Sequence, residues 1–333
     1  MPLVTSITKL DWANADKDYK KGQNLIRQGN WATGFKLHEL RSLPDAFWNP
    51  NAKFPGPKTN FDRAAVWTPG VSVRSRNVIV WSEAGWGDMI QFSRFIPMLK
   101  QITSGVHCVY PDNIIPLLKR MDKSIPYSQA TRECPPSSYR VKMMSLPYLL
   151  IEHGLIKPEP VDRWYGAEGV YRNPDIVVPK RKKPLVGIFY HTTNKSWNMA
   201  AKQIPKDIVD EFMKSHKEVD WVSLQIGEGF LNSPKWTDTA DKIQTLDAVV
   251  SVDSAIAHCA ASVGVRTINL VGDETMACWR WYPVSERTYW YDNMTTVWWD
   301  NYSDWDTGLE KAMTYLVQDK PKKTSRPKKK SVV

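Results

Sequence analysis

Cysteine and histidine are scarce in this sequence, and neither residue clusters. The 333 residues hold 4 Cys and 6 His, with no CxxC pair. That spacing predicts neither a zinc site nor a disulfide framework and is typical of a reduced, intracellular protein. No apolar run approaches the ~18 residues that a membrane span needs. Residues 1–6 lack a charged segment followed by an apolar stretch, so we expect no signal peptide and a cytoplasmic location.

Several catalytic motifs are also absent. The chain has no HExxH and no Walker loop, and the turn at Gly85-Trp86-Gly87 lacks the third glycine of a dinucleotide fingerprint. Two Asp-x-Asp stretches, 16–18 and 304–306, match the form used by metal-dependent sugar-nucleotide enzymes. The first lies among expected helical residues, and the second opens an expected helix, where capping explains it. We therefore predict no metal site.

Excess positive charge is concentrated at one end of the chain. The formal charge is +10, and residues 320–330 contribute seven Lys or Arg and no acid. This segment has too few apolar residues to fold, so we expect residues 319–333 to form a disordered basic tail. Such a tail either seeks phosphate groups, as on DNA, or only improves solubility. The sequence leaves both open.

The remaining composition and patterning are those of an α/β protein. Hydrophobic residues make up 42 % and charged residues 24 %, and the length favours two domains. Apolar runs of strand length alternate with segments of helical periodicity, which predicts two doubly wound parallel sheets. The expected strands are 77–81, 106–110, 184–190, 221–225, 248–252 and 267–271, and the expected helices are 88–102, 113–121, 205–216, 253–263 and 304–316.

These patterns divide the chain into four parts. We expect a helical segment at 1–50, a first Rossmann-like domain at 51–178, a second at 179–318, and the tail. A polar stretch within 130–183 is typical of a hinge. Two such domains joined by a hinge enclose a cleft, where a ligand is expected.

The turn after the first expected strand is the first candidate site. Gly85 and Gly87 let the backbone leave the sheet sharply, and Glu83 lies in the same loop. Asp88 falls in the first turn of the next helix, at the sheet edge where ligands bind. This carboxylate is either a helix cap or a general base that faces the cleft.

The second candidate site follows the strand at 248–252. Asp253, Ser254 and Ala255 open a helix of small residues, and exposed N–H groups together with the helix dipole suit a pyrophosphate. His258 lies one turn further on, where it could donate to a phosphate oxygen. The alternative is that Asp253 caps the helix and His258 is a core histidine.

Further groups are expected at the same cleft. Arg280 and Trp281 lie in an aromatic stretch, where arginine can pair with phosphate or stack on a base, and the alternative is a Trp-rich core. His191, Asn194 and Lys202 follow another strand and offer polar and cationic groups.

Several stretches resemble one family. Residues 78–99, 222–225, 246–258 and 279–283 closely resemble bacterial and phage glycosyltransferases linked to tetratricopeptide repeats. Those proteins are similar to ADP-heptose heptosyltransferases of glycosyltransferase family 9, and more remotely to O-GlcNAc transferases. Residues 29–41 look like one degenerate tetratricopeptide unit. The resemblance covers roughly residues 20–315.

The resemblance implies a GT-B fold and a metal-independent, inverting glycosyltransferase without a cofactor. Asp88 then looks like the general base. The donor diphosphate loop looks like Asp253, Ser254, Ala255 and His258, with Lys202, Gln225, Arg280 and Trp281 as further donor-binding residues. The chain departs from the family at Lys202, where an arginine is usual, and at Ser254-Ala255, where heptosyltransferases have Thr-Gly.

The partner implied by the resemblance is a nucleotide-diphosphate sugar. The acceptor is open: a hydroxymethylated DNA base, reached through the tail, or a saccharide or protein hydroxyl. A phage-encoded chain would act in the host cytoplasm. The alternative function is a non-catalytic module that binds a nucleotide or nucleic acid on the same fold.

Overall fold

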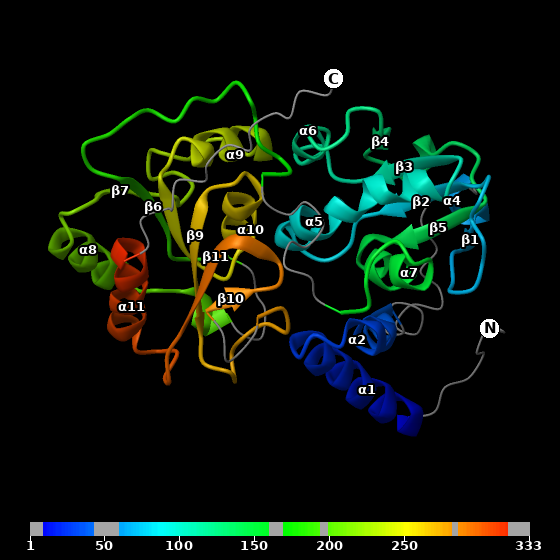
Figure 1. Cartoon of the computed structure of the whole chain (residues 1–333), viewed down its shortest axis with the longest axis horizontal. Coiled ribbons are helices and arrows are strands. Elements are labelled where there is room, and N and C mark those ends of the chain that lie inside the picture. Colours follow the sequence, from blue (N-terminus) through cyan, green and yellow to red (C-terminus); the bar gives the residue numbers. More distant parts are fainter. Residues whose placement is uncertain (1–8, 43–59, 160–168, 194–198, 282–285, 319–333) are drawn as a thin grey trace, which may run out of the picture.

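A computed structural model describes residues 9–42, 60–159, 169–193, 199–281 and 286–318 (Figure 1). Two sheets lie side by side, and each forms the centre of one lobe. We call the lobe around the first sheet the first lobe and the lobe around the second sheet the second lobe. The predicted basic tail and Asn194 lie outside the described residues.

The first sheet has five strands, all parallel, in the order β1-β5-β2-β3-β4. Its central strand carries Val78, Ile79 and Val80, which are fully buried, as expected for a parallel strand covered on both faces. The strands are β1 Ala65–Val66, β2 Asn77–Trp81, β3 Gly105–Val109, β4 Tyr127–Ser128 and β5 Tyr139–Lys142.

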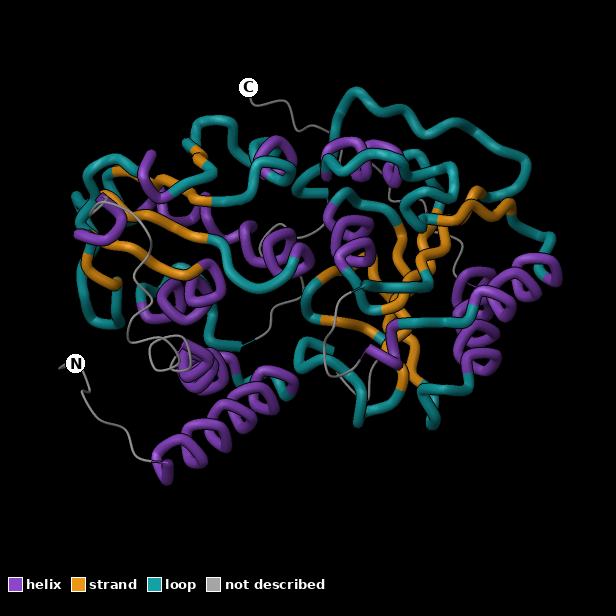
Figure 2. The backbone as a smooth tube through the Cα atoms, turned by 180° about the vertical axis from the view of Figure 1, so that it is seen from behind, coloured by secondary structure: helices purple, strands orange, loops and turns teal. Residues whose placement is uncertain are grey.

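The second sheet has six strands in the order β10-β11-β9-β8-β6-β7. Every pair is parallel except β10 with β11. Figures 1 and 2 show helices on both faces, which agrees with the complete burial of β8. The strands are β6 Leu185–Phe189, β7 Asp220–Ser223, β8 Ala248–Val252, β9 Arg266–Gly272, β10 Arg287–Thr288 and β11 Tyr291–Trp298.

Helices connect and flank these strands. In the N-terminal segment and the first lobe they are α1 Lys9–Arg27, α2 Trp31–His38, α4 Asn60–Arg63, α5 Trp86–Phe92, α6 Ile115–Leu118 and α7 Leu146–Glu152. In the second lobe they are α8 Lys206–Ser215, α9 Trp236–Gln244, α10 Ala255–Ser262 and α11 Trp305–Gln318. Short 3₁₀ helices include η1 Glu39–Ser42, η2 Ser93–Gln101, η4 Met143–Ser145 and η5 Met199–Lys202.

The predicted α/β class with parallel sheets is confirmed, and two details of the prediction were wrong. The expected helix 88–102 ends as α-helix at Phe92 and continues as η2, which contains Pro97. A proline inside a helix removes a backbone donor, which explains the change of geometry. The expected hinge at 130–183 contains β5 and α7, so much of it is part of the first lobe. The four-part division of the chain stays a prediction.

The N-terminal helices contact both lobes. Trp31 on α2 is fully buried and stacks on Trp290 of the second lobe, with ring centroids 6.4 Å apart. Arg27 donates to the Ala277 carbonyl oxygen at 2.7 Å. On the other side, Arg41 of η1 donates to Glu83 of the first lobe. The helical pair therefore ties the two lobes together. Its kinship with tetratricopeptide units stays a prediction.

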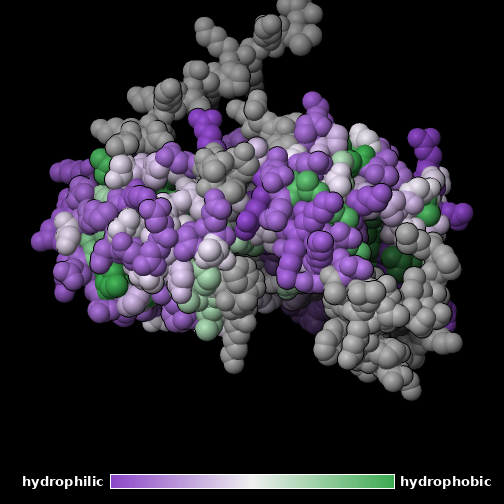
Figure 3. Space-filling view, turned by 90° about the horizontal axis from the view of Figure 1, so that it is seen from below, coloured by the Kyte–Doolittle hydropathy of each residue, from purple (hydrophilic) through white to green (hydrophobic). Residues whose placement is uncertain are grey.

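The surface that Figure 3 shows is largely hydrophilic, with small scattered hydrophobic patches. None of the described helices combines the length and the apolar character that crossing a membrane requires.

Candidate active site

Asp88 lies at the N-terminal end of α5, where the chain leaves β2. The backbone N–H of Gly85 donates to Asp88 Oδ2 at 2.8 Å, so the carboxylate caps its own helix. Ala84, just before this turn, has a φ of 61°, a strained conformation for a residue with a side chain. The cap accounts for one oxygen of Asp88 only, and the other oxygen faces the second lobe.

Arg280 of the second lobe forms an ion pair with Asp88 Oδ1. Three further contacts fix the guanidinium: its Nε donates to Gln91 Oε1 at 2.6 Å, and it lies over the rings of Trp279 and Phe92. Burial lowers the pKa of Arg280 to about 10, so it remains charged at neutral pH. The pair places a fixed positive charge beside the Asp88 carboxylate.

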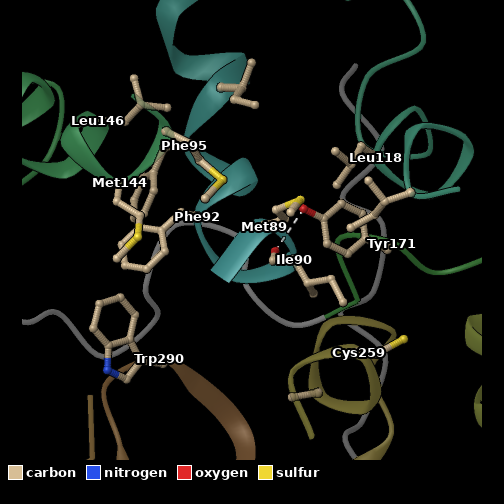
Figure 4. Packing of buried hydrophobic residues seen from close by; sticks show 14 of the residues in the cluster. Met89, Ile90, Phe92, Phe95, Leu118, Met144, Leu146, Tyr171, Cys259 and Trp290 are labelled. Atoms are coloured by element: carbon tan, nitrogen blue, oxygen red, sulfur yellow. Dashed lines mark hydrogen bonds between the residues drawn. The ribbon is translucent and has the colours of Figure 1, made fainter. Parts of the chain in front are cut away.

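The first turn of α5 packs directly on the first turn of α10. A Cβ added to Gly87 would lie 3.4 Å from Ala255 Cα and 2.8 Å from His258 Cδ2. Figure 4 shows side chains at the same junction, with Tyr171 beside α5 and Cys259 on α10. The Tyr171 hydroxyl donates to the Ile90 carbonyl oxygen at 3.0 Å. The carboxylate of one lobe and the helix N-terminus of the other therefore share one small region.

The start of α10 is capped by a serine. Ser254 is the N-cap residue, and its Oγ accepts from the Ala257 N–H at 3.4 Å and contacts Ser251 Oγ at 3.0 Å. The helix dipole places partial positive charge at this end. The start of α10 can thus favour an anion at the carboxyl edge of the second sheet.

A buried ion pair supports this turn. Lys202 Nζ lies 2.9 Å from Asp253 Oδ2, and Asp253 is 8 % exposed. Burial alone would raise the pKa of Asp253, but the Lys202 ammonium outweighs it and holds that pKa below its usual value. Burial opposes the charge of Lys202, whereas Asp253 raises its pKa above the usual value. Both groups are ionised at neutral pH.

His258 is a buried, neutral histidine. Burial lowers its pKa to about 4. Its Nδ1 lies 2.9 Å from the Tyr291 hydroxyl, and its ring stacks on Trp281. Trp281 itself is fully buried. In this arrangement both side chains belong to the core beneath the turn, which is the alternative that the sequence left open for them.

Other predicted residues take different places. Glu83 is not free in the cleft: it accepts two bonds from Arg41 and one from the Met144 N–H at 2.9 Å, so it anchors the N-terminal helices. His191 is exposed and pairs with Gln203 in a β-bridge. Gln225 follows β7, with its backbone N–H donating to Ser223 Oγ.

The structure adds a pocket that the sequence analysis missed. Its volume is about 370 Å³, and it opens at the carboxyl edge of the first sheet, where β2, β3 and β4 end. The residues that line it are Ser82, Val109, Tyr110, Pro111, Asp112 and Gln129. They come from three separate loops, so no local pattern marked them. The one feature of the sequence that could have indicated this pocket is that most of these residues lie at or just after the ends of expected strands.

Comparison with known proteins finds a family match for part of the second lobe. Residues 235–302 match the model of Glycosyltransferase family 9 (heptosyltransferase), and the match includes the turn at Ser254 and Arg280. This segment is similar to that family. The match supports a glycosyltransferase enzyme, although it covers well under half of the chain. No curated protein matches the chain.

Three solved structures are similar to it at low identity. The iron-containing dodecameric glycosyltransferase TibC from enterotoxigenic E. coli H10407 is 14 % identical, with 60 % of this chain and 59 % of TibC covered and a TM-score of 0.45. E. coli heptosyltransferase WaaC with ADP is 12 % identical over 72 % of this chain and 98 % of WaaC, at a TM-score of 0.44. The glycosyl transferase family 9 from Veillonella parvula DSM 2008 is 10 % identical, with 73 % of this chain and 90 % of that chain covered and a TM-score of 0.43. The chain therefore spans about three fifths of TibC.

No group of three His, Cys, Asp or Glu side chains that could hold a metal ion occurs within the described parts of the chain. TibC is nevertheless described as iron-containing. The four cysteines are free thiols.

The contact between α5 and α10 gives a first prediction. We expect Gly87→Ala to lower the free energy of unfolding by about 1–3 kcal/mol, because its Cβ would press on the His258 ring, which Tyr291 and Trp281 hold in place. Chemical denaturation measures the change. Gly85→Ala is the matched control, because its Cβ would meet only Asp88 Oδ2, at 3.4 Å. Equal stability of the two variants would contradict a tight contact at Gly87.

Proposed function

We propose that the chain is an inverting glycosyltransferase of GT-B architecture, which moves a sugar from a nucleotide-diphosphate donor to an acceptor hydroxyl. One observation carries the proposal. The turn that holds Asp88 packs against the start of α10, so a carboxylate and a positively polarised helix end lie together between two Rossmann-like lobes. The family 9 match over residues 235–302 supports the donor side of this arrangement.

The proposed reaction is a single displacement. The acceptor hydroxyl oxygen attacks the anomeric carbon of the donor sugar while Asp88 accepts the hydroxyl proton. The bond between the anomeric carbon and the diphosphate oxygen breaks, and the diphosphate keeps the electron pair. Attack from the face opposite the leaving group inverts the anomeric configuration.

The leaving diphosphate gains negative charge, which the second lobe is arranged to stabilise. The first turn of α10 lies at the carboxyl edge of the sheet, and its positive helix end faces the side where the diphosphate would lie. Asp253 holds Lys202 beside the same turn. Arg280 extends from the next loop toward Asp88 and completes the positive side of the site. We propose that His258 and Trp281 support this turn from below rather than contact the donor.

The proposal includes independence from metal ions, because the chain itself offers positive groups for the diphosphate. A chelator should therefore leave turnover unchanged, whereas a loss of turnover that added metal restores would remove this part of the proposal.

The test is a panel of nucleotide sugars. The purified full chain is incubated with ADP-, UDP-, GDP- and dTDP-linked sugars without acceptor, and release of the free nucleoside diphosphate is measured. We expect slow hydrolysis of one donor class, with water as the acceptor. Retention of a nucleotide without any turnover, with or without candidate acceptors, would favour the alternative of a non-catalytic binding module.

A further inference from the structure

The pocket at the edge of the first sheet lies next to Asp88 along the chain. Ser82 lines the pocket and begins the loop that leads from β2 to α5. Trp86 is the first residue of α5, two positions before Asp88, and it is 36 % exposed. Few large apolar side chains of the described residues are this exposed, and an exposed tryptophan offers a flat face to a ligand.

A second tryptophan, from the other lobe, contacts Trp86. The rings of Trp86 and Trp236 lie 6.1 Å apart at an angle of 46°. Trp236 begins α9, and its backbone N–H donates to the Asn113 carbonyl oxygen at 3.1 Å. Asn113 directly follows Asp112, which lines the pocket. The aromatic pair does not line the pocket, but it is joined to the pocket loops through Asn113 and through the loop after Ser82, and we call Trp86 and Trp236 the rim.

The chemistry of the pocket favours an uncharged ligand. Its lining residues carry one carboxylate, one side-chain amide and two hydroxyls, from Asp112, Gln129, Ser82 and Tyr110, and none of its six residues is Lys, Arg or His. The Gln129 amide donates to Asp112 Oδ2, which fixes the two side chains side by side. A phosphate would meet the Asp112 charge without a compensating cation, whereas sugar hydroxyls can donate to both groups.

Size agrees with this assignment. The pocket volume of about 370 Å³ falls in the range of roughly 300–1,000 Å³ typical of small-ligand sites. A sugar ring has apolar C–H faces and a polar rim. That combination fits an aromatic face beside a carboxylate and an amide.

We propose that this pocket and its rim form an acceptor subsite for a neutral sugar ring, which stacks on Trp86 and donates hydroxyl protons to Asp112 and Gln129. The inference rests on the proposed function and narrows its acceptor to a neutral saccharide. A ring held there lies close to the turn that carries Asp88, which would then take the proton of the reacting hydroxyl.

Binding of glycans without donor tests the subsite. The full chain is applied to an array that carries neutral oligosaccharides, phosphorylated oligosaccharides and single-stranded DNA with 5-hydroxymethylated pyrimidines, and the hits are titrated by ligand-observed NMR. We expect binding of neutral oligosaccharides. Preference for the phosphorylated glycans or the DNA, or no glycan binding, would overturn the assignment.

Variants locate the binding. Trp86→Ala should weaken it about tenfold or more, while Trp86→Phe keeps a flat face and should retain most of it. Gln129→Leu removes an exposed polar side chain and should also weaken binding, without disturbing the core. The control is Val177→Ala, an exposed position outside the pocket. Unchanged binding in both Trp86→Ala and Gln129→Leu would place the glycan elsewhere and overturn the subsite.

Donor hydrolysis by the unaltered chain separates this inference from the proposed function. A protein that releases nucleoside diphosphate but binds no neutral glycan keeps its glycosyltransferase function and loses this subsite. A protein that binds neutral glycans through Trp86 but hydrolyses no donor keeps the subsite as a glycan-binding site and loses the transfer reaction.

Discussion

Asp88→Asn should lower kcat by about 10²–10⁴-fold, because general-base catalysis typically contributes that much and an amide accepts no proton at neutral pH. The single amide oxygen can still accept the Gly85 N–H bond, so the turn should keep its shape, while the ion pair with Arg280 is lost. We therefore expect donor binding to change little. Steady-state kinetics with the donor identified by the panel, together with a titration of donor binding, checks both parts.

Asp304→Asn is the matched control for this substitution. Asp304 also caps a helix, accepting from the Thr307 N–H at 3.2 Å at the start of α11, far from α5 in the fold. Loss of a capping carboxylate should affect both variants in a similar way, and only Asp88→Asn should lose turnover. If the two variants had the same kcat, Asp88 would be a helix cap and not a base.

The strands that the sequence predicted well are those whose pattern is purely local. β2 and β8 match the expected bounds because each is an apolar run that is buried on both faces. β5 was missed because its sequence is Tyr-Arg-Val-Lys, which does not read as a buried strand, yet it lies between β1 and β2. β11 was missed because Asp292 and Asn293 interrupt its apolar residues. Neighbouring strands, not local propensity, fix both.

The candidate site also combines features that the sequence predicts with features that depend on distant residues. Topology predicted that Asp88 and the start of α10 lie at carboxyl edges that face each other, and the structure brings their turns into contact. The ion pair between Asp88 and Arg280 joins residues 192 positions apart, and no sequence pattern could indicate it. The same holds for the role of Glu83, which depends on Arg41 approaching from the N-terminal helices.

The N-terminal helices contact the loops on both sides of the Asp88–Arg280 pair, which the sequence did not indicate. Arg27 donates to Ala277 in the loop that carries Arg280, and Trp31 stacks on Trp290, whose indole N–H donates to the Arg280 carbonyl oxygen. Arg41 holds the loop that carries Glu83 and leads to Asp88. These helices therefore support both members of the Asp88–Arg280 pair from outside the two lobes.

Lys202→Met should lower the free energy of unfolding at pH 7 by about 3–5 kcal/mol, because it leaves the buried Asp253 carboxylate without its partner. Adding Asp253→Asn in the same chain removes the unpaired charge and should restore much of the loss. Lys206→Met is the control: Lys206 pairs with Asp210 on the surface of α8, and exposed pairs contribute little. Denaturant unfolding of the three variants beside the unaltered chain gives the comparison.

The dependence on pH distinguishes a lost ion pair from lost packing. The pKa of Asp253 is lower in the folded chain than in the unfolded chain, so the pair stabilises the fold above the unfolded pKa of about 3.9 and loses this effect as the pH falls through the folded value. In Lys202→Met, burial still raises the pKa of Asp253 and the ammonium that opposed it is gone, so acid should relieve the unpaired charge. The stability deficit of Lys202→Met relative to the unaltered chain should therefore shrink as the pH falls from about 7 to about 4, toward the ordinary pKa of a carboxyl group. A deficit that stays constant over that range would show that Lys202 stabilises the fold by its packed alkyl chain and not by its charge.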